Sequence, residues 1–444
     1  MAMANDTPRD EALRIIEKFE SLPLEKRLAV FRELSAQGRE ELIRTVTRPG
    51  EIIRRISEEE MYFTVKELGA ENAPALVSRT TGKQLTYFLD LDLWKLDMFD
   101  AKAAGRWVEI LAGIGEEKIL QFIQVADPEL IFMALRPFLR VHLRNPEVDL
   151  LEEQDYLPSF TIDDTFFVEF LSHRLESSLK IFLDAMFRWD QQYYFTMMEQ
   201  LVMGGSSLEN EEMAFKWRRA RLADKGFPDF DEAIQIYQYL RKESLSDPLP
   251  ETEPADIDAS ERSDVLLAYP LKLIDAETLF KKCLDEVLDH SERDRLTTEL
   301  AHMGNKVMVA DGRDPGSIED LQGSLKKVAG YINIALEELC GDDCGLAAGI
   351  MRSNHMEFLF RRGFSLILDL RKKAQEMLRG YEGGAENLGH PLAAIVQGLL
   401  EKRPLYAGDL EGGRRPREFQ HLAEIEGIRK MMDRAKIEEK WEPI

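Results

Sequence analysis

The stretch IIEKFESLPLEKRLAVF at residues 15–31 decides the fold of this chain, because its apolar pattern returns twice at a spacing of 46 residues. The pattern recurs in MYFTVKELGAENAPALV at residues 61–77 and in WVEILAGIGEEKILQFI at residues 107–123. A period of this length built from short helices is typical of armadillo and HEAT repeats, in which each repeat buries its apolar face against the next. The sequence therefore predicts a helical superhelix.

Residues that cap helices recur with the same spacing. Ser35, Thr81 and Asp127 occupy one column of the repeat, and each can cap a helix N-terminus through a side-chain oxygen. Ser57 and Asp100 are expected to begin the first helix of the second and third copies. These positions predict where the helices start.

Burial follows from the same alignment. Arg39 stands where the later copies have Leu85 and Ile131, so we expect Arg39 on the polar outer face of a terminal repeat. Eight recurring apolar side chains are predicted to be buried between helices: Met61, Val65, Leu76, Leu89, Trp107, Leu111, Phe122 and Leu135.

The rest of the chain also has few alternating apolar and polar stretches, so the predicted fold is all-α. Residues 1–141 form the three repeats, and residues 142–243 continue them in degenerate form after a polar, acidic connection. Residues 244–262 combine proline with acidic residues, which is typical of an exposed linker. Residues 263–444 are expected to form a C-terminal helical domain.

Two resemblances add to this pattern. Residues 15–140, including the turn ADPE at 126–129, are similar to the superhelical N-terminal domain of MgtE-type magnesium transporters. That family continues into nucleotide-binding-like modules and a membrane domain, neither of which is seen here, so transport is not expected. NKVMVADGRDPGS at 305–317 and FLFRRGFSLILDLR at 358–371 resemble a bacterial family of uncharacterised helical proteins. That likeness implies no activity.

Composition limits the class of function. The 58 Lys and Arg against 82 Asp and Glu give a net charge of −24, which opposes sequence-independent binding to nucleic acid or to anionic lipid. No apolar run is long enough to span a membrane, and the start MAMANDTPRDEALR lacks a signal-peptide pattern. Three cysteines are too few for a disulfide framework, so a cytoplasmic protein is expected.

Thiols and an imidazole suggest one candidate metal site. Cys340 and Cys344 form a close pair, with His355 after them and Cys283 far upstream. Zinc usually takes four ligands offered as two tight pairs, and only one pair is present. We therefore predict no metal and expect two reduced thiols at a helix end, with a redox pair as the alternative.

Acidic residues gather in two further places. Asp90, Asp92, Asp97 and Asp100 could bind a divalent cation, but their spacing matches no calcium loop. A solvated turn with Asp100 as an N-cap is the favoured interpretation. Asp311, Asp314 and Gly316 are expected in a turn between two helices: Gly316 is followed by a capping box at Ser317 and Asp320.

Cations surround one tryptophan. Lys216, Arg218, Arg219 and Arg221 lie next to Trp217, an arrangement that could stack a base or hold a phosphate. The alternative, which we favour, packs Trp217 inward and leaves the arginines at the surface. A second basic cluster at Arg414, Arg415 and Arg417 precedes a tail that is typical of a solvated helical face.

No catalytic or cofactor motif is recognisable, so no catalytic residue and no cofactor is predicted. We expect an adaptor or scaffold that binds a protein partner through exposed aromatic, Arg or Met side chains of the superhelix. A divalent-cation or small-ligand sensor, and an enzyme of unrecognised type, are the alternatives.

Overall fold

The computed structural model describes residues 16–145, 157–204, 207–240, 277–286, 290–379, 384–385, 388–408 and 415–439. Contacts between Cα atoms divide these residues into an N-terminal unit that ends at Leu222 and a C-terminal unit that begins at Ala223. The predicted linker at 244–262 lies outside the described residues. Within the described residues, no helix is both long and apolar enough to cross a membrane.

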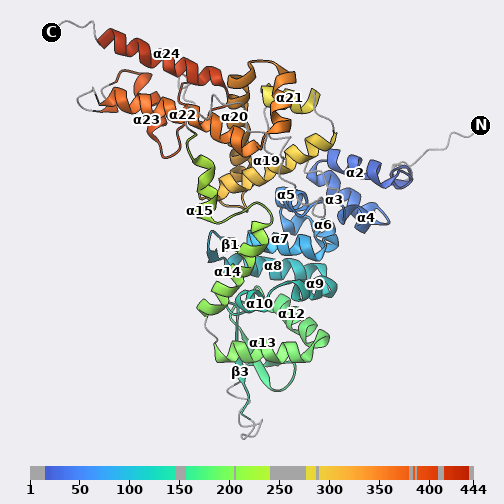
Figure 1. The fold of residues 1–444 in the computed structure, drawn as a ribbon. Helices are drawn as coiled ribbons and strands as arrows, with labels where there is room; N and C mark the ends of the chain where they lie inside the picture. The colour runs from blue at the N-terminus through green and yellow to red at the C-terminus, as the bar shows by residue number, and fades with distance from the viewer. Residues whose placement is uncertain are drawn as a thin grey trace, which may run out of the picture. The chain divides into compact units, whose positions relative to one another are not determined.

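The N-terminal unit consists mainly of short helices (Figure 1). Its elements are α2 (Leu24–Glu33), α3 (Ala36–Thr45), α4 (Pro49–Ile53), α5 (Glu58–Leu68), η1 (Ala70–Asn72), α6 (Pro74–Arg79), α7 (Gly82–Asp92), β1 (Trp94–Lys95), β2 (Met98–Phe99), α8 (Ala101–Ile114), α9 (Glu116–Val125), α10 (Pro128–Leu135), β3 (Leu139–Leu143), β4 (Phe160–Thr161), β5 (Phe166–Phe170), α12 (Glu176–Trp189), α13 (Gln191–Met203) and α14 (Ser207–Ala223). Helices α5 and α7 pack together, α7 packs on α9, and α12 packs on α8 and α9.

The predicted helix starts are confirmed. Ser35, Thr81 and Asp127 are at the N-cap positions of α3, α7 and α10, and Ser57 and Asp100 are at those of α5 and α8. Asp127 makes no side-chain hydrogen bond to α10, because its carboxylate pairs with Arg221 instead. The eight apolar side chains predicted to be buried lie in helices and are all buried. Recurrent apolar residues and side-chain caps were thus sufficient to locate these helices.

The prediction that Arg39 lies on a polar outer face is wrong. Its side chain is buried beside Glu60, at 3.2 Å, and donates to the Thr64 hydroxyl at 2.7 Å. It also donates to the carbonyl oxygens of Phe31 and Arg32. A buried carboxylate on α5 therefore holds a cation where the other copies have an apolar side chain.

Two small antiparallel sheets correct the all-α expectation. Strands β1 and β2 form a hairpin, and β3, β5 and β4 form a sheet in that order. Leu139 pairs with Phe170, and Phe160 pairs with Val168. The first half of β5 is buried. Because these strands have only two to five residues each, they leave a weak local signal.

The C-terminal unit is built around two long helices that pack on each other, α20 and α22. Its elements are α15 (Phe230–Ala233), η2 (Ile234–Tyr237), α18 (Leu279–Glu286), α19 (His290–Ala310), α20 (Ile318–Cys340), α21 (Cys344–Ser353), α22 (Met356–Leu378), α23 (Leu392–Leu400) and α24 (Leu422–Glu439). Residues 230–237, which the sequence placed with the degenerate repeats, pack on α19 and α22.

The contact between α20 and α22 depends on a glycine. A Cβ built on Gly363 of α22 would lie 2.0 Å from the carbonyl oxygen of Tyr331 on α20. The absence of a side chain therefore allows the two backbones to approach closely. Tyr331 also stacks on Phe364, with ring centroids 5.7 Å apart. This crossing forms the centre of the C-terminal core.

Candidate functional site

A pocket in the N-terminal unit lies between α5, η1, α7 and α8. Helix α5 ends at Gly69, whose φ of 83° lies in the left-handed region that favours glycine. The chain turns there into η1, and the Asn72 amide donates to the carbonyl oxygen of Leu68 at 2.9 Å. This turn places Gly69, Ala70 and Glu71 along one side of the pocket.

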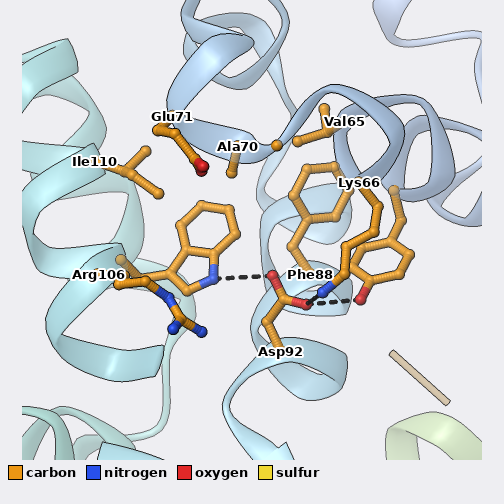
Figure 2. Close-up of a pocket in the computed structure, with 11 residues that line it drawn as sticks. Val65, Lys66, Ala70, Glu71, Phe88, Asp92, Arg106 and Ile110 are labelled. Atoms are coloured by element: carbon orange, nitrogen blue, oxygen red, sulfur yellow. Dashed lines mark hydrogen bonds and ion pairs between the residues drawn. The ribbon is translucent and has the colours of Figure 1, made fainter. Parts of the chain in front are cut away.

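Asp92, the last residue of α7, forms the polar floor of the pocket (Figure 2). Its Oδ1 accepts hydrogen bonds from the Tyr62 hydroxyl at 2.7 Å and from Lys66 Nζ at 2.6 Å. Its Oδ2 accepts one from the Trp107 indole N–H at 3.1 Å. Both oxygens are occupied and Lys66 neutralises the charge, so the floor is held in one geometry.

Aromatic rings form the walls of the pocket. The rings of Tyr62 and Phe88 have centroids 5.5 Å apart, and those of Phe88 and Trp107 lie 6.2 Å apart. Val65 and Ile110 complete the apolar lining. The cavity volume is about 180 Å³, slightly larger than a cavity of ~150 Å³ that holds benzene.

Two charged side chains lie at the edge of this pocket. Arg106 is on α8 and Glu71 is on η1, and both are exposed. Figure 2 shows Glu71 and Arg106 among the residues that line the pocket, on two different elements. Among the described residues, neither forms an ion pair with the other or with a third side chain. The pocket therefore offers two unused charges of opposite sign.

The four clustered acidic residues, Asp90, Asp92, Asp97 and Asp100, do not form one site. Asp92 faces the pocket, whereas Asp90 is buried on the opposite face of α7 against Arg221. Asp100 caps α8, as predicted, by accepting from the backbone N–H groups of Lys102 and Ala103. In the described part of the chain, no three His, Cys, Asp or Glu side chains are grouped to hold a metal ion.

The basic cluster on α14 has the reverse of the favoured orientation. Trp217 is 48% exposed, whereas Arg218 is 5% exposed and donates to the carbonyl oxygens of Asp90 and Leu96. Arg221 contacts both carboxylate oxygens of Asp90, at 2.7 and 2.8 Å. Arg218 and Arg221 turn inward because oxygen atoms of α7 and the hairpin accept from them, whereas Arg219 stays exposed.

Large apolar side chains are exposed on both the hairpin and α14. We call these side chains the hairpin–α14 surface. Its members are Leu96, Met98, Met213 and Trp217, which are 59%, 68%, 40% and 48% exposed. The hairpin and α14 are in contact, because Trp94 packs on Phe215 with ring centroids 5.5 Å apart. Leu96 also has a φ of 58°, which is uncommon for a residue other than glycine.

The cysteines and His355 do not assemble into a site. Cys340 ends α20 and donates its thiol to the Leu336 carbonyl oxygen, while Cys344 begins α21. Burial raises the pKa of the Cys340 thiol to about 11, with Asp343 and Cys344 acting in the same direction. A thiol with so high a pKa is a poor nucleophile at neutral pH.

Asp311 in the C-terminal unit is a residue whose role the sequence did not reveal. The turn after α19 was predicted, and Asp314 stabilises it by accepting from Gly316 N–H at 2.9 Å. The side chain of Asp311, however, is only 7% exposed and accepts from Lys327 at 2.8 Å, Tyr237 at 3.0 Å and Arg403 at 3.1 Å. These partners come from α20, η2 and the segment after α23, so Asp311 joins distant parts of the unit.

The second basic cluster is only partly described. Arg414 lies outside the described residues, and Arg415 is exposed. Arg417 pairs with Glu424 at 2.6 Å and lies over the Tyr406 ring, 4.5 Å from its centroid. It therefore helps to attach the start of α24.

Sequence reasoning also missed the pocket. Asp92 was considered as one of four clustered acids, while Glu71 and Arg106 were not considered at all. In the repeat alignment Tyr62 matches Val108 and Trp107 matches Met61, so both read as apolar core residues and their polar ends were concealed. A buried Tyr or Trp usually needs a hydrogen-bond partner, and that need was the available signal for Asp92.

Comparison with known proteins gives one match. No curated protein and no solved structure is similar to this chain. The resemblance of residues 15–140 to the MgtE-type domain therefore receives no support. Residues 16–441 match the model of a family of unknown function, DUF6178, and this match agrees with the predicted likeness to an uncharacterised helical family. Because the match extends over most of the chain, the protein belongs to this family, DUF6178.

Proposed function

We propose that this protein binds a protein partner through the hairpin–α14 surface. The observation that carries the proposal is the exposure of two methionines, a leucine and a tryptophan on two elements that contact each other. Met and aromatic side chains are enriched in the buried centres of interfaces, and tryptophan is among the residues that most often dominate binding.

The backbone of the hairpin supports this assignment. Leu96 has a positive φ, a backbone conformation of higher energy for a residue other than glycine. Its side chain is 59% exposed, so packing within the fold does little to offset that energy. Arg218 holds the Leu96 carbonyl oxygen at 3.1 Å and so stabilises this conformation. Such residues cluster at binding sites, where the conformation presents a side chain.

Charge indicates the kind of partner. Lys216 and Arg219 are exposed on α14 on either side of Trp217, in a chain whose net charge is −24. We assign to the surface a partner segment with apolar residues flanked by acidic ones, because such a segment matches both the apolar side chains and the local cations.

We also propose that α2 to α13 form an armadillo-like superhelix that carries this surface. The support is the recurrence of N-caps at Ser35, Thr81 and Asp127, each followed by a helix, and the cap at Asp190 before α13. Each helix would then bury its apolar face on the next.

A cytoplasmic setting fits the same proposal, since Cys283, Cys340 and Cys344 form no disulfide with one another. The divalent-cation alternative has no assembled ligand set in the described residues. The pocket is the observation that favours the small-ligand alternative.

The experiment places a photo-crosslinking amino acid at position 98 or 217 in native cells and identifies the captured peptides. We expect both positions to capture one apolar, acidic segment of one partner. A synthetic peptide of that segment should then bind the wild-type chain and bind Met98→Ser/Trp217→Ser at least about tenfold more weakly. Leu346→Ser changes a leucine of similar exposure in the other unit and is the matched control.

Equal affinity of the peptide for the wild-type chain and the double variant would refute the proposal. Capture of a second copy of this chain at both positions would instead assign the surface to self-association.

A further inference from the structure

The pocket of the N-terminal unit contains two charges that the protein does not use. Arg106 and Glu71 line one cavity of about 180 Å³, yet they form no ion pair with each other or with other described side chains. A ligand that carries both a negative and a positive group could pair with Arg106 and Glu71 at the same time.

Gly69 helps to keep Glu71 in this position. A Cβ built on Gly69 would lie 3.0 Å from Oε1 of Glu71, which is closer than most real contacts of that kind. The glycine, already favoured by its positive φ, therefore leaves room for the carboxylate beside the pocket.

The remaining charges of the pocket cancel. Lys66 and Asp92 form an ion pair at 2.6 Å, and the other oxygen of Asp92 is occupied by Trp107. A purely anionic ligand would meet Glu71, and a purely cationic ligand would meet Arg106. The net neutrality of the pocket thus favours a ligand that is itself a zwitterion.

We propose that this pocket binds a free α-amino acid with an apolar side chain. The Arg106 guanidinium has the planar shape to hold the ligand carboxylate with two parallel hydrogen bonds. Glu71 accepts from the ligand ammonium, and the Trp107 ring beside it adds a cation–π contact. Val65, Phe88 and Ile110 provide an apolar lining for the ligand side chain.

Pocket size and the presence of both charges distinguish this ligand from a peptide. The cavity holds a molecule somewhat larger than benzene, which suits a single amino acid. A chain end carries only one of the two charges, because the neighbouring group is an amide. The proposal is independent of the hairpin–α14 surface, which lies on other elements, so either can fail alone.

The test is calorimetric titration of the full chain with leucine, isoleucine, valine and methionine. We expect at least one to bind with a Kd of about 1 mM or tighter. N-acetyl-leucine and leucinamide, which each lack one charge, should bind at least about tenfold more weakly than leucine.

Single variants then assign the site. Arg106→Gln and Glu71→Gln should each weaken binding about tenfold or more, because each removes a hydrogen bond between charged groups. Lys102→Gln on α8 and Glu67→Gln on α5 change exposed charges outside the pocket lining and should leave binding unchanged. Both pocket residues are exposed, so their replacement should preserve the fold.

Three results would overturn the proposal. One is the absence of binding by all four amino acids at about 10 mM. Another is equal binding of leucine and N-acetyl-leucine, which would make the pocket an anion site. The third is binding that neither Arg106→Gln nor Glu71→Gln alters, which would place the amino acid elsewhere.

Discussion

Two buried lysines, one in each unit, are held in different ways. Lys327 of the C-terminal unit is 1% exposed and lies 2.8 Å from Asp311 and 3.1 Å from Glu418. Lys118 of the N-terminal unit is 3% exposed, and its Nζ is 2.6 to 2.9 Å from neutral oxygens only, those of Thr80 and Gln121.

The difference shows that burial of a lysine does not determine its charge. Burial without a carboxylate partner lowers the pKa of Lys118 to about 7, because the charged form loses its hydration. A neutral amine can still donate to the Thr80 carbonyl at the end of α6. Lys327 instead completes a network with two acids, so its removal would leave buried charges uncompensated.

The largest expected effect comes from Lys327→Met. The variant leaves Asp311 and Glu418 without their shared cation, and the free energy of unfolding should fall by about 3–5 kcal/mol. Urea unfolding of the full chain, followed by far-ultraviolet circular dichroism, measures the loss. Lys326→Met changes the exposed neighbour on the same helix and should have little effect. A loss below about 1 kcal/mol for Lys327→Met would show that the network is not cooperative.

Lys118 provides the second test, through pH. With a pKa of about 7, Lys118 of the folded chain is about half neutral at pH 7 and loses its proton as the pH rises towards 9.5, while the unfolded chain binds a proton there until about pH 10.4. Since the unfolded state binds more protons, stability should rise with pH, by at most about 1.4 kcal/mol for each pH unit.

Lys118→Met lacks this titration, so the difference in stability between wild type and variant isolates it. Thermal unfolding at pH 7 and 9.5 should show the wild type gaining relative to Lys118→Met. A constant difference would mean that Lys118 remains protonated in the folded chain.

The sequence predicted what depends on local pattern. Caps such as Thr81 and Asp100 were found because a side-chain oxygen next to an apolar helix has a recognisable spacing. The start of α20 was predicted for the same reason, from the capping box at Ser317 and Asp320.

What depends on contacts between distant residues was missed. Arginines such as Arg39 and Arg218 are usually found at the surface. Here Arg39 forms a buried ion pair with Glu60, and Arg218 donates a buried hydrogen bond to the Asp90 carbonyl oxygen; both partners are distant in the sequence. The pocket requires η1, α7 and α8 to meet, and no single stretch contains that information. Trp217 was placed inward because apolar character alone was considered.

An acid titration gives the third test, on the C-terminal network. Burial alone would raise the pKa of the Asp311 carboxyl, but Lys327, Arg403 and Tyr237 together hold it below 3.8. The stability that this ionised carboxylate contributes is therefore complete above about pH 4 and is lost as the pH falls through the lower, folded value. Asp311→Asn should flatten the loss of stability between about pH 4 and 2.5 in urea unfolding curves. An unchanged slope would assign the acid sensitivity to other carboxylates.

The smallest expected effect is that of Lys66→Met at the pocket floor. Lys66 is 37% exposed in its ion pair with Asp92, so water screens the pair and competes for both groups. The carboxylate also keeps its hydrogen bonds from Tyr62 and Trp107 after the substitution. The free energy of unfolding should therefore fall by only about 0.2–1 kcal/mol, against the several kcal/mol expected for Lys327→Met in the same urea assay. Equal losses for the two variants would show that exposure does not separate the two lysine–aspartate pairs. If the fold stays intact and the loss is small, Lys66→Met removes one charge from the pocket without unfolding the unit. The variant can then be used to test how the pocket charge affects ligand binding.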